Sequence, residues 1–288
     1  MQYISTLICH SHVEMAISCL GRLLTFCRNS IGIRIHDDGT LTDEDYERLG
    51  ATLDNPVIIS TEEANDLLVN FLRSYPALAA LRTRQALFHK LIDTAVTYPN
   101  HNYAFCDPDV LFLRPFLLPP NPFTHFIFIQ DRQPSYSFRS WNLARSSDVT
   151  LPHKANTGFI MGPKHLINWD YLAWFVAQPL HHSIPYFLEQ TAWAALGMKV
   201  GCRSFDPTQI QIMRDEPHDT QLVGGHFTER TRDLIPQYLR QSQDTNEYLP
   251  PVTLRTIPAG QCTSVTLAKY EFVRILTRLR TACRRIGF

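Results

Sequence analysis

Apolar and polar positions follow two different periods along the first part of the chain. Short apolar runs at residues 1–9, 31–36 and 56–60 predict β-strands. Residues 12–27 carry apolar side chains at helical spacing, residues 42–45 form a capping box that opens a second helix to about residue 53, and another helix begins at residue 61. Strands and helices that alternate at such short spacing predict a parallel sheet with crossover helices.

The rest of the chain continues this α/β pattern up to about residue 240. It predicts a long helix at 77–96, strands at 102–106, 125–130 and 157–161, and helices at 163–176 and 185–196. Residues 241–264 are polar and contain three prolines, so we expect a linker. We therefore divide the chain into a domain at 1–240, a linker at 241–264 and a C-terminal helix at 265–288.

Composition excludes several classes of protein. The 288 residues include 44% hydrophobic residues, and 27 Lys and Arg balance 27 Asp and Glu, which is typical of a soluble globular chain. A net charge of zero argues against a nucleic-acid-binding protein. Residues 1–9 lack the features of a signal peptide, so we expect a cytoplasmic protein. The seven cysteines contain no CxxC pair, which predicts reduced thiols.

The strongest candidate for chemistry is a pair of acids directly after the predicted strand at 102–106. Asp107 and Asp109 would lie at the carboxyl end of a buried strand, where α/β sheets bind ligands. Two carboxylates this close repel each other unless a cation or a proton compensates, and oxygen ligands suit Mg²⁺ or Mn²⁺. On the motif alone, an Asp-Pro turn that ends the strand is an equal alternative.

Two further loops contain candidate ligands. Gly224 and Gly225 would let a phosphate approach the backbone, and the imidazole of His226 could bind the same cation, although the spacing alone equally suits a structural or surface histidine. Asp38 follows the strand at 31–36, where an acid can bind a ribose or a base. The same Asp-Asp-Gly sequence is also typical of an ordinary turn.

Basic and polar residues near these loops complete the candidate set. Arg82, Arg84 and Lys90 lie on the helix that precedes the acidic pair and could neutralise a diphosphate, unless they form a solvated helix face. Glu189 is an acid beside an apolar run, and Asn156 precedes a buried strand. Each of these two residues also fits an ordinary surface or loop position.

The order of these motifs resembles a known family. It runs from the acidic turn at 35–39 through the basic helix at 82–93 and the D-x-D segment at 103–112 to residues 156–160, 189–192 and 225–227. In this order the chain resembles the GT-A-fold glycosyltransferases, and most of all the nucleotide-sugar transferases related to glycogenin and the galactosyltransferases. The resemblance covers residues 1–240. It implies a GT-A-like α/β fold whose central sheet is mainly parallel and flanked by helices.

The resemblance also implies a donor and roles for individual residues. The donor would be a nucleotide-diphosphate sugar, usually a UDP-sugar, bound through Mn²⁺ or Mg²⁺ that Asp107, Asp109 and His226 hold. By the same comparison, Asp38 would lie near the base, and Arg82 and Lys90 near the donor phosphates or the sugar. Asn156 and Glu189 would lie near the transferred sugar or the acceptor. The related group has a lysine-containing segment after its late histidine, whereas here Arg230 or Arg232 would have to substitute.

The implied activity is transfer of the sugar to a hydroxyl of a saccharide or a lipid-linked glycan. Breaking the sugar–phosphate bond leaves a diphosphate whose growing charge a divalent cation and nearby Lys or Arg stabilise. If the reaction inverts the anomeric centre, Glu189 is our candidate for the general base, and if it retains configuration no such base is required. The alternatives are a non-catalytic sugar-nucleotide-binding or scaffold protein and a nucleotidyltransferase.

The C-terminal segment is predicted to be a basic amphipathic helix. Residues 265–286 contain one acid, Glu271, and six basic residues beside an apolar stripe. Such a helix can lie on an anionic membrane surface, which would place the protein peripherally at the inner membrane face. Alternatively, the helix packs against the domain or against another subunit.

Overall fold

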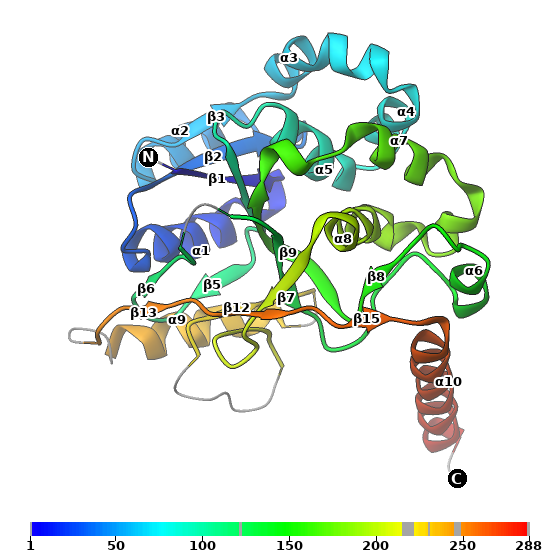
Figure 1. Cartoon of the computed structure of the whole chain (residues 1–288). Coiled ribbons are helices and arrows are strands. Elements are labelled where there is room, and N and C mark those ends of the chain that lie inside the picture. The colour runs from blue at the N-terminus through cyan, green and yellow to red at the C-terminus, as the bar shows by residue number, and fades with distance from the viewer. Residues whose placement is uncertain (1, 121–122, 215–221, 230, 245–248, 287–288) are drawn as a thin grey trace.

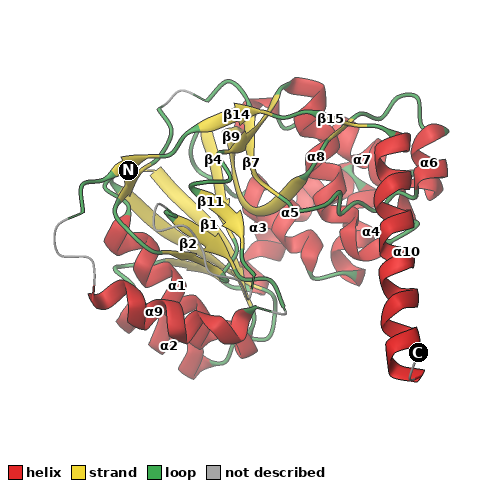
Figure 2. Ribbon diagram, turned by 90° about the horizontal axis from the view of Figure 1, so that it is seen from below, coloured by secondary structure: helices red, strands yellow, loops and turns green. Residues whose placement is uncertain are grey.

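A mixed eight-stranded sheet lies at the centre of the computed structural model, which describes residues 2–120, 123–214, 222–229, 231–244 and 249–286 (Figure 1). Its strands are β1 (Gln2–Ile8), β2 (Ile31–Asp37), β3 (Val57–Ile59), β4 (Asn102–Cys106), β7 (Phe126–Gln130), β9 (Ala155–Pro163), β10 (Cys202–Phe205) and β14 (Thr256–Pro258). They are arranged in the order β14-β10-β7-β9-β4-β1-β2-β3. Helices cover both faces of this sheet (Figure 2).

The first part of the chain confirms the predicted alternation of strands and helices. Helices α1 (Val13–Phe26), α2 (Asp43–Thr52) and α3 (Thr61–Ser74) follow β1, β2 and β3 in turn, and these strands pair in parallel. Thr42 and Asp45 form the predicted capping box at the start of α2. Because β4 is also parallel to β1, the carboxyl ends of β1, β2 and β4 meet at one edge of the sheet.

The single helix predicted at 77–96 is wrong, because the chain breaks it into α4 (Pro76–Arg84) and α5 (Leu87–Val96). Gln85 is extended between them, with φ −141° and ψ 112°. The break lets Nε and Nη2 of Arg82 bind both carboxylate oxygens of Asp93 at 2.7 and 2.8 Å. In one continuous helix the two residues would be about 16 Å apart along the axis, too far for an ion pair.

The second half of the chain reverses the direction of the sheet. Strand β9 pairs antiparallel with both β4 and β7, so its first residues lie beside the carboxyl end of β4. Helices α7 (Trp169–Ala177) and α8 (Leu188–Val200) begin later than predicted, each after a short 3-10 turn. A short helix, α6 (Ser140–Ala144), lies in the long connection between β7 and β9.

Alternation along the strands builds a separate core on each face of the sheet. Phe105 and Phe128 pack under helices α3, α4, α5, α7 and α8, whereas Ala104 and Ile129 face α1 and α2 on the other side. The six cysteines whose side chains the structure describes are free thiols, as the sequence predicted.

The segment predicted as a linker adds strands to the domain instead. After α9 (Ile235–Asp244), strand β13 (Val252–Thr253) pairs with β6 (Phe116–Leu117), β14 pairs with β10, and β15 (Gln261–Cys262) pairs with β8 (Leu151–Pro152). Residues 252–262 are therefore part of the folded body. These strands are two or three residues long and include proline, so they leave no alternating pattern in the sequence.

Helix α10 (Ser264–Ile286) extends away from the body of the molecule (Figure 1). Its first turns contact α6, where Oε2 of Glu271 accepts a hydrogen bond of 2.6 Å from the hydroxyl of Ser140. Among the described residues, no helix is both long enough and apolar enough to cross a membrane.

Candidate metal and donor site

Several candidate residues lie at the edge of the sheet where β1, β2 and β4 end. Asp38 follows β2, and Asp107 and Asp109 follow β4. Asn156 reaches the same edge from the start of the antiparallel strand β9. The sheet topology therefore brings together residues from three separate parts of the chain, as expected for ligand sites in α/β folds.

A small second sheet brings His226 to the acidic pair. After the turn at Asp107–Asp109 the chain enters β5 (Val110–Phe112), which pairs antiparallel with β12 (Gly224–His226). His226 is the partner of Val110 in this register, and the amide of Phe227 donates to the carbonyl oxygen of Asp109 at 2.9 Å. The pairing places an imidazole against the D-x-D turn.

The geometry of these three side chains suits one divalent ion. Ligand atoms of Asp107, Asp109 and His226 all lie within 4.8 Å of one another. Nε2 of His226 is 3.0 Å from Oδ1 of Asp109 and 3.8 Å from Oδ2 of Asp107. Two neighbouring ligands of an octahedral ion, each about 2.1 Å from it, would be about 3.0 Å apart. Oδ1 of Asp109 is buried without a hydrogen bond of good geometry, which also fits a metal ligand.

The other nitrogen of His226 fixes which ring atom faces the acids. Nδ1 lies 2.8 Å from Oδ1 of Asn156, and that oxygen also accepts a hydrogen bond of 2.8 Å from the amide of Gly158. An amide oxygen only accepts, so Nδ1 donates a proton to Asn156, and Nε2 is the ring atom that faces Asp109. Partners of this kind orient metal-binding histidines in known sites.

Gly158 leaves room for this arrangement. A Cβ at this position would lie 2.9 Å from Oδ1 of Asn156 and even closer to the imidazole of His226. Any larger residue would therefore displace the histidine or its partner. The carbonyl oxygen of Gly158 also accepts a hydrogen bond of 2.7 Å from the amide of Asp107, which ties the D-x-D turn to β9.

Lys90 partly neutralises the first acid. Its ammonium group, on the buried face of α5, donates to both oxygens of Asp107 at 2.9 Å. Burial raises the pKa of Asp107, Lys90 opposes this, and the charge of Asp109 adds to the rise, so that the net pKa is raised. Burial alone would lower the pKa of Lys90, but Asp107 and Glu189 outweigh it and the pKa is raised.

Arg232 binds the second acid from the segment after β12. Its Nε and Nη2 donate to Oδ2 of Asp109 at 3.0 and 2.7 Å, and Nη1 lies 3.1 Å from Nε2 of His12. Burial raises the pKa of Asp109, but His226 and Arg232 outweigh it and lower the pKa to about 2. Asp109 is therefore ionised throughout the physiological range.

Glu189 lies in the same buried region, on the first turn of α8. Its Oε2 accepts a hydrogen bond of 3.2 Å from the hydroxyl of Thr157, and Oε1 is buried without a hydrogen bond. Burial raises the pKa of Glu189 to about 7, although the charge of Lys90 opposes this. A carboxyl group with such a pKa can take up or release a proton near neutral pH.

Three residues that were predicted to bind the donor contact other groups than the three residues of the metal cluster. Asp38 holds the turn after β2, where its Oδ1 accepts from the hydroxyl of Thr40 at 2.6 Å, as the ordinary-turn alternative predicted. Arg82 is buried and binds Asp93 and, from α3, Asn65. Arg84 is exposed at the end of α4, not buried among the apolar positions of the predicted helix. Their roles in donor binding stay predictions.

Sequence reasoning left His12 outside the candidate set and gave Arg232 only as one of two alternatives. His12 precedes α1 at the carboxyl end of β1, so its position after a parallel strand was the available signal. The contact between Arg232 and Asp109 depends on the path of the chain beyond β12, which has no local pattern. The other alternative, Arg230, lies outside the described residues.

Solved structures with the same architecture identify the fold. No protein-family model matches the sequence, and a search of curated proteins finds no match. The apo form of mouse xyloside xylosyltransferase 1 is similar with a TM-score of 0.55 at 11% identity, over 80% of this chain and 98% of that one. An active-site mutant of LgtC has a TM-score of 0.55 at 9% identity, over 86% and 98% of the two chains. The bifunctional glycosyltransferase WbbM has a TM-score of 0.53 at 7% identity, over 86% and 52%.

These similarities establish that the chain has the GT-A fold of nucleotide-sugar glycosyltransferases, as the order of its motifs predicted. The fold is a large central sheet with helices on both faces. Within it, the D-x-D acids and the late histidine form an Asp-Asp-His cluster that is compatible with a divalent metal ion.

Proposed function

We propose that the protein is a metal-dependent glycosyltransferase. It moves a sugar from a nucleotide-diphosphate donor, most often a UDP-sugar, to a hydroxyl of a glycan or lipid-linked acceptor. The observation that supports this most is the Asp107–Asp109–His226 cluster at the ligand-binding edge of a GT-A sheet. A bound Mn²⁺ or Mg²⁺ would supply positive charge beside the departing diphosphate.

The chain's own residues have distinct parts in this proposal. Asp107, Asp109 and His226 hold the ion, and Asn156 keeps the Nε2 lone pair of the histidine directed at it. Lys90 and Arg232 bind these carboxylates, and in this proposal their charges also act on the phosphates of a donor. Positive charge that is already in place stabilises a developing anion without reorganisation.

Glu189 supports an enzyme rather than a binding protein with the same fold. A buried carboxyl group is costly to keep, and its raised pKa suits a general base for the acceptor hydroxyl. We assign this role to Glu189 for an inverting reaction. A non-catalytic sugar-nucleotide-binding protein would have no need of an acid at this position.

Thermal unfolding with nucleotide sugars tests the proposal directly. We expect UDP-sugars to raise the midpoint only when Mn²⁺ or Mg²⁺ is present, and Asp109→Asn to abolish the shift. The matched control is Asp66→Asn on the exposed face of α3. If the stabilising donor also turns over, the product should be UDP. Pyrophosphate as product would instead indicate a nucleotidyltransferase, and no metal-dependent shift with any nucleotide sugar would refute the proposal.

We also propose that α10 binds an anionic membrane surface. Its apolar stripe is exposed, with 61% of Phe272, 55% of Ile275 and 56% of Leu279 accessible. The sequence of this helix contains six basic residues and a single acid, so anionic lipid headgroups complement its charge. This location would suit a lipid-linked acceptor, and the predicted cytoplasmic side of the membrane is part of the same proposal.

Vesicle sedimentation tests the membrane contact. We expect the full chain to bind vesicles of phosphatidylcholine with phosphatidylglycerol, and the double variant Phe272→Gln, Ile275→Gln to lose this binding. Leu67→Gln, which changes an apolar side chain on α3 that is 55% exposed, is the control. Equal binding of the double variant, or dimerisation through the stripe in place of vesicle binding, would contradict the proposal.

A further inference from the structure

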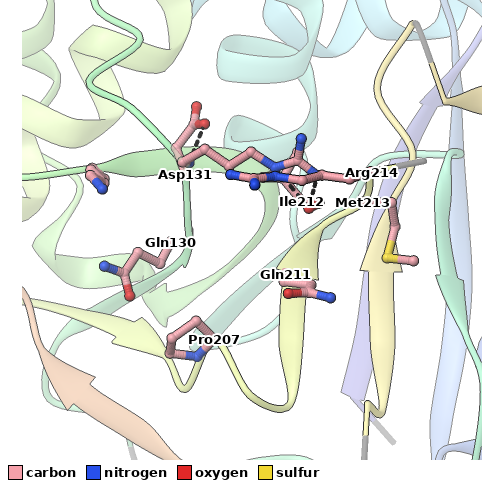
Figure 3. A pocket seen from close by; sticks show the side chains of 9 residues that line it. Gln130, Asp131, Pro207, Gln211, Ile212, Met213 and Arg214 are labelled. Carbon is pink, nitrogen blue, oxygen red and sulfur yellow. Dashed lines mark hydrogen bonds between the residues drawn. The ribbon is translucent and has the colours of Figure 1, made fainter. Parts of the chain in front are cut away.

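A polar cleft of about 350 Å³ includes Ile212, the register partner of His226, in its wall. Figure 3 shows the residues that line this cleft. It lies between the end of β7, the start of β9 and strand β11 (Ile210–Ile212) with the residues after it. The side chains around it are those of Gln130, Asp131, Arg132, Lys154, Pro207, Gln211, Ile212, Met213 and Arg214. This volume is within the usual range for small-molecule sites of about 300–1,000 Å³.

Strand pairing places the cleft next to His226 on the side away from the D-x-D turn. The small sheet has the order β11-β12-β5, and Ile212 in the cleft wall is the register partner of His226. On the opposite wall, Gln130 pairs with Ala155, one residue before Asn156. A ligand in this cleft would therefore lie across β12 from Lys90 and Asp107.

Three basic side chains line the described part of the cleft. Among the described residues that line it, Arg132, Lys154 and Arg214 are basic and Asp131 is acidic. Nε of Arg132 donates to the carbonyl oxygen of Ile212 at 3.1 Å, which holds the guanidinium across the cleft.

The position of Lys154 is also fixed from outside the cleft. Its ammonium nitrogen lies 5.5 Å from the ring centroid of Tyr270 on α10. Such a contact keeps the charge in place while leaving its hydrogen-bond donors available to oxygen acceptors. Three cations around one small cleft are typical of a site for phosphate or carboxylate oxygens.

We propose that this cleft binds an anionic group, a phosphate or a carboxylate, that belongs to the acceptor. The proposal rests on the glycosyltransferase function above and narrows its substrate class to acidic or phosphorylated acceptors. The acceptor, not the donor, is the source because the cleft and the cations of the D-x-D turn lie on opposite sides of β12. The acceptor hydroxyl would then approach the site from the side of His226.

Binding of inorganic phosphate in EDTA tests the cleft without metal or nucleotide. We expect the full chain to bind phosphate, and Lys154→Gln and Arg214→Gln each to weaken it about ten- to a hundredfold, as for loss of a hydrogen bond to a charged group. Lys199→Gln and Arg73→Gln, both exposed elsewhere, are the matched controls. Phosphate binding that is absent in the wild type, or equal in all variants, overturns the proposal.

A second titration separates the acceptor from the donor. With Mn²⁺ present, we expect UDP to bind wild type, Lys154→Gln and Arg214→Gln with the same affinity. The two variants should weaken glucose 6-phosphate or glucuronate while leaving glucose unchanged. A parallel loss of UDP affinity would assign the cleft to the donor diphosphate and overturn the proposal. Failure of UDP to bind even the wild type would refute the proposed function. The phosphate titration in EDTA would still show whether the cleft binds an anion.

Discussion

Replacing Glu189 with glutamine should stabilise the protein at neutral and alkaline pH while it reduces activity. The carboxyl group is 3% exposed, and burial raises its pKa from 4.5 to about 7. Glutamine has nearly the same shape, and its oxygen can keep the hydrogen bond from the hydroxyl of Thr157. It carries no charge at any pH.

The sign of the effect follows from proton binding. Between pH 4.5 and 7 the folded protein holds the proton on Glu189 more tightly than the unfolded chain does, so the free energy of unfolding falls as pH rises. At pH values above the pKa of Glu189 in the folded protein, this contribution to the free energy of unfolding is fully lost. A difference of about 2.5 pKa units corresponds to about 3 kcal/mol, a large part of the usual 5–15 kcal/mol for a domain.

Urea unfolding at several pH values measures this directly. The difference in free energy of unfolding between Glu189→Gln and wild type should be near zero at pH 4.5 and grow to about 3 kcal/mol at pH 8. Glu47→Gln, at an exposed position of α2, should show no such growth. If Glu189 is the general base, the turnover rate should also fall about 10²- to 10⁴-fold. Parallel pH profiles for variant and wild type would refute the reasoning.

Two further changes probe the metal cluster and the packing of the helices. Gly158→Ala should push His226 aside and abolish stabilisation by Mn²⁺ in thermal unfolding. Gly21→Ala is the control, because a Cβ there meets nothing within 4 Å, and it should keep this stabilisation. Normal Mn²⁺ affinity in Gly158→Ala would contradict this account. Arg82→Met should cost about 3–5 kcal/mol in urea unfolding because it leaves the carboxylate of Asp93 buried without its main partner. A loss below about 1 kcal/mol would show that this ion pair does not hold α4 against α5.

Local patterns predicted the parts of this fold that depend on neighbouring residues. The apolar stripe of α1 and the capping box at Thr42 are short-range features, and both appear in the structure. The position of Asp107 and Asp109 at the edge of the sheet followed from the parallel order of the strands around them. The alternation of strands and helices predicts a parallel sheet, and in such a sheet the carboxyl ends of the strands lie at one edge.

Contacts between distant residues could not be predicted in the same way. No proline or glycine marks the break at Gln85 in the sequence. The break is stabilised instead by the ion pair of Arg82 with Asp93, which forms only when the chain folds. The spacing of His226 alone favoured a structural or surface histidine, and the family resemblance placed it at the metal cluster. Its partner Asn156 is 70 residues away, beyond the reach of any local pattern.

The separation of these residues along the chain has a consequence for the order in which the candidate site forms during synthesis. Arg232 and Asp109, which meet in the finished site, are 123 residues apart. Long-range pairing of strands is a slow step in folding because a large loop must close first. A nascent chain would therefore carry its two aspartates long before it gains the histidine and arginine. If the cluster holds Mn²⁺ as proposed, the ion should bind late in folding, and added Mn²⁺ should raise the stability of the folded state.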